Sequence, residues 1–230
     1  MKVSGVFRFV PRRLVIIRRW RMIMAEPPVN GRLAFREIVD LPESNKLLRA
    51  IRGTLSKRFS LKSGNSLLLV SELASYLYAL DRIDEALKIL TFVESNIVFN
   101  GDHNIWTPVG YSICLLSRIR KFEGDSAEST RLLNRILENP FTTPDPVVGR
   151  FSLIRVSRIR GVLDSAACDS SDKWSCNKLS NALLNCLYHA EMGYMLNIYV
   201  EESRKNHMDN LELNIAHGIG LLRERLLRAA

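Results

Sequence analysis

Four cysteines and four histidines give this chain its strongest candidates for metal binding and nucleophilic chemistry. Cys186 and His189 are one helical turn apart, a spacing that can hold zinc, and Cys176 precedes them. The sequence lacks a Cys-x-x-Cys pair and a fourth ligand at a comparable spacing. A cysteine on a helix usually behaves as a small buried apolar residue. The pattern therefore favours buried thiols over a metal site, and we expect no cofactor.

The other patterns do not predict an enzyme active site. Asp84 and Glu85 fall in the first turn of an expected helix, where carboxylates complement the exposed backbone amides. Gly218 and Gly220 lie inside an expected helix, whereas a phosphate-binding loop would lie between a strand and a helix. The histidines occur without a nucleophile in a recognisable context, at His103, His189, His207 and His217. We therefore expect a protein without enzymatic activity.

Arginines form the most distinctive charged pattern in the body of the chain. They fall into two groups, Arg118, Arg120 and Lys121 in the first and Arg150, Arg155, Arg158 and Arg160 in the second. The tetrapeptide Ser-Arg-Ile-Arg occurs in both groups, at 117–120 and at 157–160. On neighbouring helices these side chains would form a positive ridge that binds an acidic protein surface or a nucleic-acid backbone. The competing interpretation is a solvated face balanced by nearby carboxylates. No aromatic residues interleave with the arginines, which makes RNA the weaker partner.

Basic charge is concentrated at the start of the chain. The net charge is +9, but the first 24 residues hold seven basic residues and no acidic one, which leaves 26 basic against 24 acidic residues downstream. Three interpretations are open: a targeting sequence, a membrane-surface anchor, or a translation start assigned too early. The apolar run Leu14–Ile17 is shorter than the roughly 7 to 15 residues of a secretory signal, and Ser4 alone supplies the hydroxyls typical of an organellar presequence. Met24 stands just ahead of Pro27 and Pro28, and we favour a start there.

The overall composition is that of a folded protein. Hydrophobic residues make up 47% of the chain and charged residues 25%, which argues against bulk disorder. No apolar stretch reaches the length of about 18 residues that a membrane-spanning helix needs. The cysteines are too few and too irregularly spaced for a disulfide framework. These observations favour a cytoplasmic protein with reduced thiols.

Apolar residues recur at helical spacing from Ser44 onward, without the alternation of a strand. We therefore expect a basic leader and linker over 1–43 and a single all-α domain over 44–230. Ser44 is expected to cap the first helix. A tight turn is expected at Ser63–Asn65, since Gly64 and Asn65 accept positive φ.

Residues 67–96 have the pattern of a helical hairpin. The apolar spacing of a first helix breaks at Asp81 and Arg82 and resumes in a second helix. The small residues Ala74 and Ala86 are placed so that the two backbones can approach closely. This arrangement resembles the tetratricopeptide repeat, whose helices pack through small residues at such positions.

A second hairpin follows the first. Gly110 repeats the opening of the motif 36 residues after Ala74, close to the family's period of about 34. The turn at 122–125 is expected to be longer than the first turn, with Asp125 capping a partner helix over 126–138. Nearer the C-terminus, Gly193 is expected to form a turn and a capping helix is expected from about residue 208.

The resemblance implies a fold and a binding surface. The fold would be stacked antiparallel helical hairpins in a short tetratricopeptide-like solenoid of about seven to eight helices. Its concave wall would be built from the first helix of each hairpin, a shape suited to a protein or peptide. In that register the residues facing a partner are Ser71, Ser75, Tyr78, Thr107, Tyr111, Arg118, Arg150 and Arg158.

The expected function is a non-enzymatic protein- or peptide-binding module. An adaptor, a regulator and a toxin-neutralising immunity protein all fit a chain of this size with no sign of catalysis. The alternative is an RNA-binding helical repeat that uses the arginine ridge. The sequence identifies neither the partner nor the oligomeric state.

Overall fold

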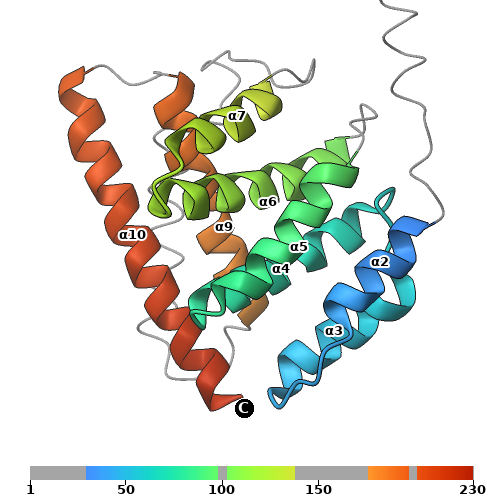
Figure 1. Cartoon of the computed structure of the whole chain (residues 1–230). Coiled ribbons are helices and arrows are strands. Elements are labelled where there is room, and N and C mark those ends of the chain that lie inside the picture. The colour runs from blue at the N-terminus through green and yellow to red at the C-terminus, as the bar shows by residue number, and fades with distance from the viewer. Residues whose placement is uncertain (1–29, 98–102, 138–175, 197–200, 230) are drawn as a thin grey trace, which may run out of the picture.

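The computed structural model describes residues 30–97, 103–137, 176–196 and 201–229, and these residues form eight α-helices and no strand (Figure 1). The expectation of an all-α fold is confirmed. The helices are α2 (Asn30–Val39), α3 (Lys46–Arg58), α4 (Gly64–Ala79), α5 (Ile83–Asn96), α6 (His103–Phe122), α7 (Ser126–Leu137), α9 (Cys176–Leu196) and α10 (Glu201–Arg228).

The helical core begins before residue 44, because α2 is part of it. The ring of Phe35 on α2 is fully buried and stacks on Phe59, with ring centroids 3.7 Å apart. The ring of Phe92 lies 5.0 Å from Phe35, so α2 is packed against both α3 and α5. The expectation that 1–43 is only leader and linker is therefore wrong for α2, whose apolar face was too short to stand out in the sequence.

The first cap and the first turn each differ from expectation by about one residue. Asn45, not Ser44, caps α3, because its Oδ1 accepts the backbone amides of Leu47 and Leu48 at 3.0 and 3.2 Å. Ser63 caps α4 by accepting the amide of Ser66. Helix α4 therefore begins at Gly64, inside the segment expected to be a turn.

A Schellman motif closes the turn between α4 and α5 at the position the sequence predicts. Asp81 has a φ of 64°, in the left-handed region. The Arg82 amide donates to the carbonyl of Leu77 at 2.8 Å, and the Asp81 amide donates to the carbonyl of Tyr78 at 3.1 Å. These two bonds define the Schellman arrangement, which usually places glycine where Asp81 stands.

The turn between α6 and α7 repeats this motif. Gly124 has a φ of 89°, and its amide donates to the carbonyl of Lys121 at 3.1 Å. The Asp125 amide donates to the carbonyl of Arg120 at 2.9 Å. Asp125 then caps α7, as expected, by accepting the amide of Glu128. The prediction of a longer second turn is wrong, since both turns use the same motif and the same number of residues.

The two equivalent turns give the true register of the two hairpins. Asp81 and Gly124 are 43 residues apart, and the same offset relates Ala74 to Ser117 and Ala86 to Ser129. All four side chains are buried, and the hydroxyls of Ser117 and Ser129 lie 2.8 Å apart. The assignment of Gly110 as the counterpart of Ala74 is therefore wrong, and the repeat is longer than the tetratricopeptide period of about 34.

Gly110 has a different packing role. A Cβ atom added there would lie 2.9 Å from the ring of Tyr188 on α9. A side chain at this position would push the ring away, so the glycine allows α6 and α9 to approach closely.

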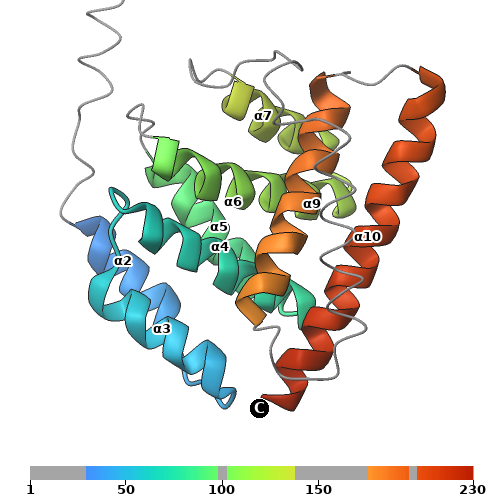
Figure 2. The same cartoon turned by 180° about the vertical axis from the view of Figure 1, so that it is seen from behind.

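The end of the chain forms two long helices. Helix α9 continues through Gly193, where a turn was expected, and α10 is one helix of 28 residues that includes the expected break near residue 208. Figure 2 shows α9 lying across α4 and α6, with α10 at the edge of the molecule. The α10 side chains expected to be buried are Leu211, Ile215, Leu222 and Leu226, which are buried, and Ile219, which is partly buried.

Helix α10 returns to the early part of the fold. It packs against α9 and also against α4. The Asn45 side chain donates to the carbonyl of Leu226 at 2.8 Å, and Nε of Arg223 donates to the carbonyl of Ala79 at 2.5 Å. A strictly linear repeat stack joins only neighbouring repeats, whereas here the last helix closes against the first hairpin.

Candidate binding site

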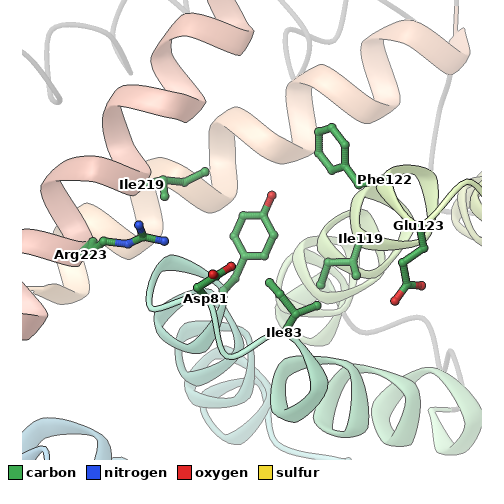
Figure 3. Close-up of a pocket in the computed structure, with 8 residues that line it drawn as sticks. Asp81, Ile83, Ile119, Phe122, Glu123, Ile219 and Arg223 are labelled. Carbon is green, nitrogen blue, oxygen red and sulfur yellow. The ribbon is translucent and has the colours of Figure 1, made fainter.

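A pocket of about 370 Å³ lies where the two equivalent turns meet α10 (Figure 3). We call it the turn pocket. Its lining comes from the end of α4, the following turn and the start of α5, from the end of α6 and the residue after it, and from the C-terminal half of α10. The lining residues are Tyr78, Asp81, Ile83, Ile119, Phe122, Glu123, Ile219 and Arg223. Figure 3 shows Ile219 and Arg223 approaching from α10, and Ile119 and Phe122 from α6. The Schellman turns therefore fix one side of the pocket and α10 forms the other.

The lining of the turn pocket is mainly apolar. Ile83, Ile119 and Ile219 supply aliphatic surface, and Phe122 supplies a ring that remains 70% exposed. A single exposed apolar side chain is common on protein surfaces. Phe122, however, stands at the edge of an apolar pocket, and aromatic residues are enriched among those that dominate the binding energy of protein interfaces.

Arg118 supports Phe122 from below. Its guanidinium carbon lies 5.0 Å from the centre of the Phe122 ring, within the range of a cation–π interaction. The same guanidinium bonds Glu191 on α9 at 3.1 Å and Glu212 on α10. Arg118 thus joins α6, α9 and α10 behind the pocket.

The two carboxylates of this cluster have opposite pKa shifts. Burial raises the pKa of Glu191, although Arg118 opposes the shift. The hydrogen bond from Arg118 lowers the pKa of the half-exposed Glu212. The cluster is an interhelical ion pair whose positive partner is nearly covered, so it stabilises the wall of the pocket rather than offering charge to solvent.

Charged residues of both signs stand at the rim. Asp81 is exposed at the left-handed turn position. Glu123 accepts a hydrogen bond from Arg120 at 2.8 Å. Arg223 reaches the rim from α10, and its Nε donates to the carbonyl of Ala79. An apolar floor with charges at its edge is the usual composition of a protein-binding patch.

The structure does not gather the predicted concave-face residues on one open surface. Ser71 is fully buried, with its hydroxyl 2.8 Å from the carbonyl of Pro108 and 3.0 Å from the hydroxyl of Ser112 on α6. Ser75 is also fully buried and lies 2.6 Å from the hydroxyl of Ser180 on α9. The prediction that these two serines face a partner is wrong, because α6 and α9 cover the face of α4 that carries them.

The other predicted residues have mixed positions. Tyr111 is buried and donates to Asn185 Oδ1 on α9 at 2.7 Å, and Arg118 is buried in its ion pairs, so neither forms an open face. Tyr78 is partly exposed and lines the turn pocket, and Thr107 is exposed near the start of α6. Arg150 and Arg158 lie outside the described residues.

The described half of the arginine ridge is already paired with carboxylates. Arg118 bonds Glu191 and Glu212, and Arg120 bonds Glu123. Of these three carboxylates, Glu191 is buried, whereas Glu212 and Glu123 are exposed. In the described residues, Arg118 and Arg120 therefore do not form an uncompensated positive ridge, which weakens the RNA alternative.

Two cysteine thiols and one carboxyl group that could take part in chemistry are buried. Cys114 and Cys186 are buried, which raises the pKa of both thiols, that of Cys186 to about 12. The carboxyl of Glu72 is buried in α4, where burial raises its pKa and the hydroxyl of Tyr76 donates to it at 2.8 Å. Among the described residues, no three or more His, Cys, Asp or Glu side chains are grouped to hold a metal.

The comparisons with known proteins identify a family. Residues 34–157 match the model of a family of unknown function, DUF6707. The chain belongs to this family. No curated protein and no solved structure matches the chain. The matched region begins at α2 and includes both Schellman turns, whereas α9 and α10 lie beyond it.

Several pocket residues were missed from the sequence. Phe122 carried a local signal, since a large aromatic residue directly before a Glu-Gly-Asp turn is placed at a helix end. Ile219 and Arg223 carried no local signal, because they reach the pocket only through the return of α10 to α4.

Within the described residues, no helix has the length and apolar character to cross a membrane.

Proposed function

We propose that this chain is a non-enzymatic protein- or peptide-binding module that engages its partner at the turn pocket. The observation that supports this most is the exposed Phe122 ring at the edge of a pocket lined by isoleucines. The ring makes a cation–π contact with Arg118. Aromatic anchors surrounded by a charged rim are typical of protein-binding patches. The sequestration of Cys114, Cys186 and Glu72 supports a role without catalysis.

The roles that fit this proposal are those of an adaptor, a regulator or an immunity protein that occludes a toxin. All three need a rigid surface and no reacting group. The repeated hairpins supply that rigidity, since two Schellman turns of the same geometry hold the pocket. The tetratricopeptide-like solenoid belongs to the same proposal, with a hairpin period of 43 residues and with α10 as the closing helix.

The test starts with the partner and ends with the pocket. Affinity purification from the native host with mass spectrometry supplies candidate proteins, each of which is then produced pure and titrated against this chain by calorimetry. Phe122→Ala is expected to weaken binding about tenfold or more, because a central aromatic anchor contributes at least this much. Glu123→Lys reverses one rim charge and is expected to change affinity in a salt-dependent way.

The matched control is Leu33→Ala. Leu33 on α2 is 62% exposed, close to the exposure of Phe122, and is absent from the pocket lining. If a pure partner bound Phe122→Ala and Leu33→Ala as tightly as it binds the unaltered chain, the turn pocket would be excluded as its binding site. Charge reversal at Arg118 is not suitable, because it would break a buried ion pair and test folding instead.

The RNA-binding alternative predicts a different result. Affinity for single-stranded RNA would fall steeply with added salt, since each phosphate contact releases counterions. Binding of RNA at physiological salt that survives Phe122→Ala would favour this alternative. The ion pairs of Arg118 and Arg120 count against it.

A further inference from the structure

Asp81 holds a turn position that glycine would fit with less strain. Its φ of 64° lies in the left-handed region, which aspartate tolerates better than most residues but glycine adopts without cost. The equivalent position of the second turn is occupied by Gly124. The Asp81 carboxylate is exposed, and it makes no hydrogen bond or ion pair with any described residue. The contacts of the described fold therefore give no reason for a carboxylate here.

This carboxylate lines the turn pocket together with groups that suit a cation. The aromatic rings of Tyr78 and Phe122 belong to the same lining. The faces of aromatic rings attract ammonium and guanidinium groups. Phe122 already makes such a contact with Arg118 and is still 70% exposed, so part of the residue is open to a second group.

The aliphatic part of the lining suits the stem of a long basic side chain. Ile83, Ile119 and Ile219 come from α5, α6 and α10 (Figure 3). Lysine and arginine bury their methylene groups against apolar surface while the charged end stays in water. A basic side chain of a partner can therefore lie along the isoleucines with its charge at the rim.

The charges of the lining favour a basic group over an acidic one. Asp81 and Glu123 contribute two carboxylates, and Arg223 contributes one guanidinium. Nε of Arg223 donates to the carbonyl of Ala79, so this side chain already links α10 to α4. Asp81 and Arg223 form no ion pair, although both line the pocket. Glu123 is paired with Arg120, which leaves Asp81 as the carboxylate of the lining that has no partner among the described residues.

We propose that the turn pocket binds a basic side chain of the partner, with its charge at Asp81 and the aromatic rings and its stem on the isoleucines. This inference rests on the proposed function, since it names the chemistry recognised at the same site. It also accounts for aspartate at the left-handed turn position, because backbone strain is concentrated at binding sites. The pocket accepts lysine or arginine and disfavours a carboxylate.

Three small ligands test which charge the pocket prefers. Acetyl-arginine amide is titrated against the full chain up to about 50 mM, where millimolar binding is detectable, and the methyl NMR signals of Ile83, Ile119 and Ile219 are followed. Acetyl-citrulline amide has the same shape without the charge, and acetyl-glutamate amide has the opposite charge. The arginine ligand is expected to bind about threefold or more tighter than the citrulline ligand, because an exposed ion pair and a cation–π contact add to the apolar contacts. Equal binding of these two ligands, tighter binding of the glutamate ligand, or no shift of the isoleucine signals would overturn the inference.

Substitution of Asp81 separates binding from folding. Asp81→Asn removes the charge and keeps a residue that tolerates positive φ, whereas Asp81→Gly also relieves the strain. Both variants are expected to bind the arginine ligand about threefold more weakly and the citrulline ligand unchanged. Asp81→Gly is expected to do so while its Tm rises, so that unfolding does not account for the weaker binding.

The matched control is Asp84→Asn. Asp84 is an exposed carboxylate in the first turn of α5 and is absent from the pocket lining, so its removal is expected to leave the affinity for the arginine ligand unchanged. If Asp81→Asn bound this ligand as tightly as the unaltered chain, or no more weakly than Asp84→Asn, the inference would be wrong.

Failure of this inference is distinguishable from failure of the proposed function. The proposed function is measured with the whole partner and Phe122→Ala, whereas this inference is measured with the small ligands and Asp81→Asn. A partner whose binding is weakened by Phe122→Ala but not by Asp81→Asn would keep the turn pocket as its binding site and exclude the basic side chain.

Discussion

The hydroxyls of Ser117 on α6 and Ser129 on α7 lie 2.8 Å apart, at the positions that Ala74 and Ala86 occupy in the preceding hairpin. Two small pairs thus occupy equivalent sites 43 residues apart. The Ala74–Ala86 pair is apolar, whereas in the Ser117–Ser129 pair the two hydroxyls hydrogen-bond each other. Both keep the helices close, but only the second can lose a buried hydrogen bond.

This difference predicts a non-additive response to substitution. Ser129→Ala is expected to lower the free energy of unfolding by about 1 kcal/mol, because the buried Ser117 hydroxyl loses a partner. The double variant Ser117→Ala, Ser129→Ala recreates the alanine pair of the first hairpin and is expected to cost less than the sum of the single variants. Urea unfolding of the four proteins measures the coupling. Strict additivity would show that the hydroxyls do not interact.

The hairpins and their first turn were predictable from the sequence because their signals are local. The break at Asp81 and Arg82 was read correctly, and so was the cap at Asp125. The repeat register was not, because Gly110 matched the small residue of the motif, and Ser117 was considered only as part of the repeated tetrapeptide 117–120. A serine that bonds another serine in the core can replace alanine, and composition alone does not reveal it.

The binding site was less predictable than the fold. Ser71 and Ser75 were placed on an open face because the coverage of α4 by α6 and α9 depends on contacts between segments far apart in the chain. Gly110 favours this coverage by allowing Tyr188 to approach. Helix α10 completes the turn pocket through Arg223, which donates to the carbonyl of Ala79. A hydrogen bond to the backbone of a residue 144 positions earlier produces no periodic pattern in the sequence.

The two Schellman turns predict opposite responses to glycine and alanine. Asp81→Gly is expected to stabilise the protein by up to about 1 kcal/mol, since the left-handed conformation strains a residue with a Cβ. Gly124→Ala is expected to destabilise it by about 1 kcal/mol for the same reason. Thermal unfolding monitored by circular dichroism measures both changes. Changes near zero at both positions would show that the left-handed conformation strains neither Asp81 nor an alanine at position 124.

Glu72 predicts a pH dependence of stability. Its pKa is raised above the ordinary 4.5 by burial, so the folded state holds the proton more tightly than the unfolded state. The group therefore stabilises the fold at low pH, and this contribution is lost as the pH rises above about 4.5 through the raised pKa. Glu72→Gln keeps the acceptor for Tyr76 without the charge. We expect this variant to match the unaltered chain near pH 4 and to exceed its stability at pH 7.

The measurement is urea unfolding of both proteins between pH 4 and 8. The difference in the free energy of unfolding should grow with pH in favour of Glu72→Gln. Glu37→Gln on the exposed face of α2 is the matched control and is expected to show no such trend. A variant less stable than the unaltered chain at pH 7 would show that the ionised carboxylate of Glu72 is the stabilising form.

Arg118 predicts the largest effect, again with a defined dependence on pH. Arg118→Met keeps the aliphatic packing but leaves the buried Glu191 without its positive partner, and breaking a buried pair costs about 3 kcal/mol or more. The low pKa of Glu212 contributes stability above its unfolded pKa, and this contribution disappears with Arg118. In the variant, Glu191 is expected to hold its proton still more tightly. Both changes make the loss greatest at neutral pH and smaller as the pH falls toward 4.

Calorimetric or urea unfolding of Arg118→Met at pH 4.5 and 7.5 measures this difference. The double variant Arg118→Met, Glu191→Gln removes the stranded charge together with its partner, and we expect it to recover part of the stability lost at pH 7.5. Glu212→Gln, which removes the more exposed partner, is expected to cost less than Arg118→Met. If the stability lost by Arg118→Met were the same at both pH values and unchanged by Glu191→Gln, the contribution of Arg118 would come from its packing beneath Phe122 and not from its charge.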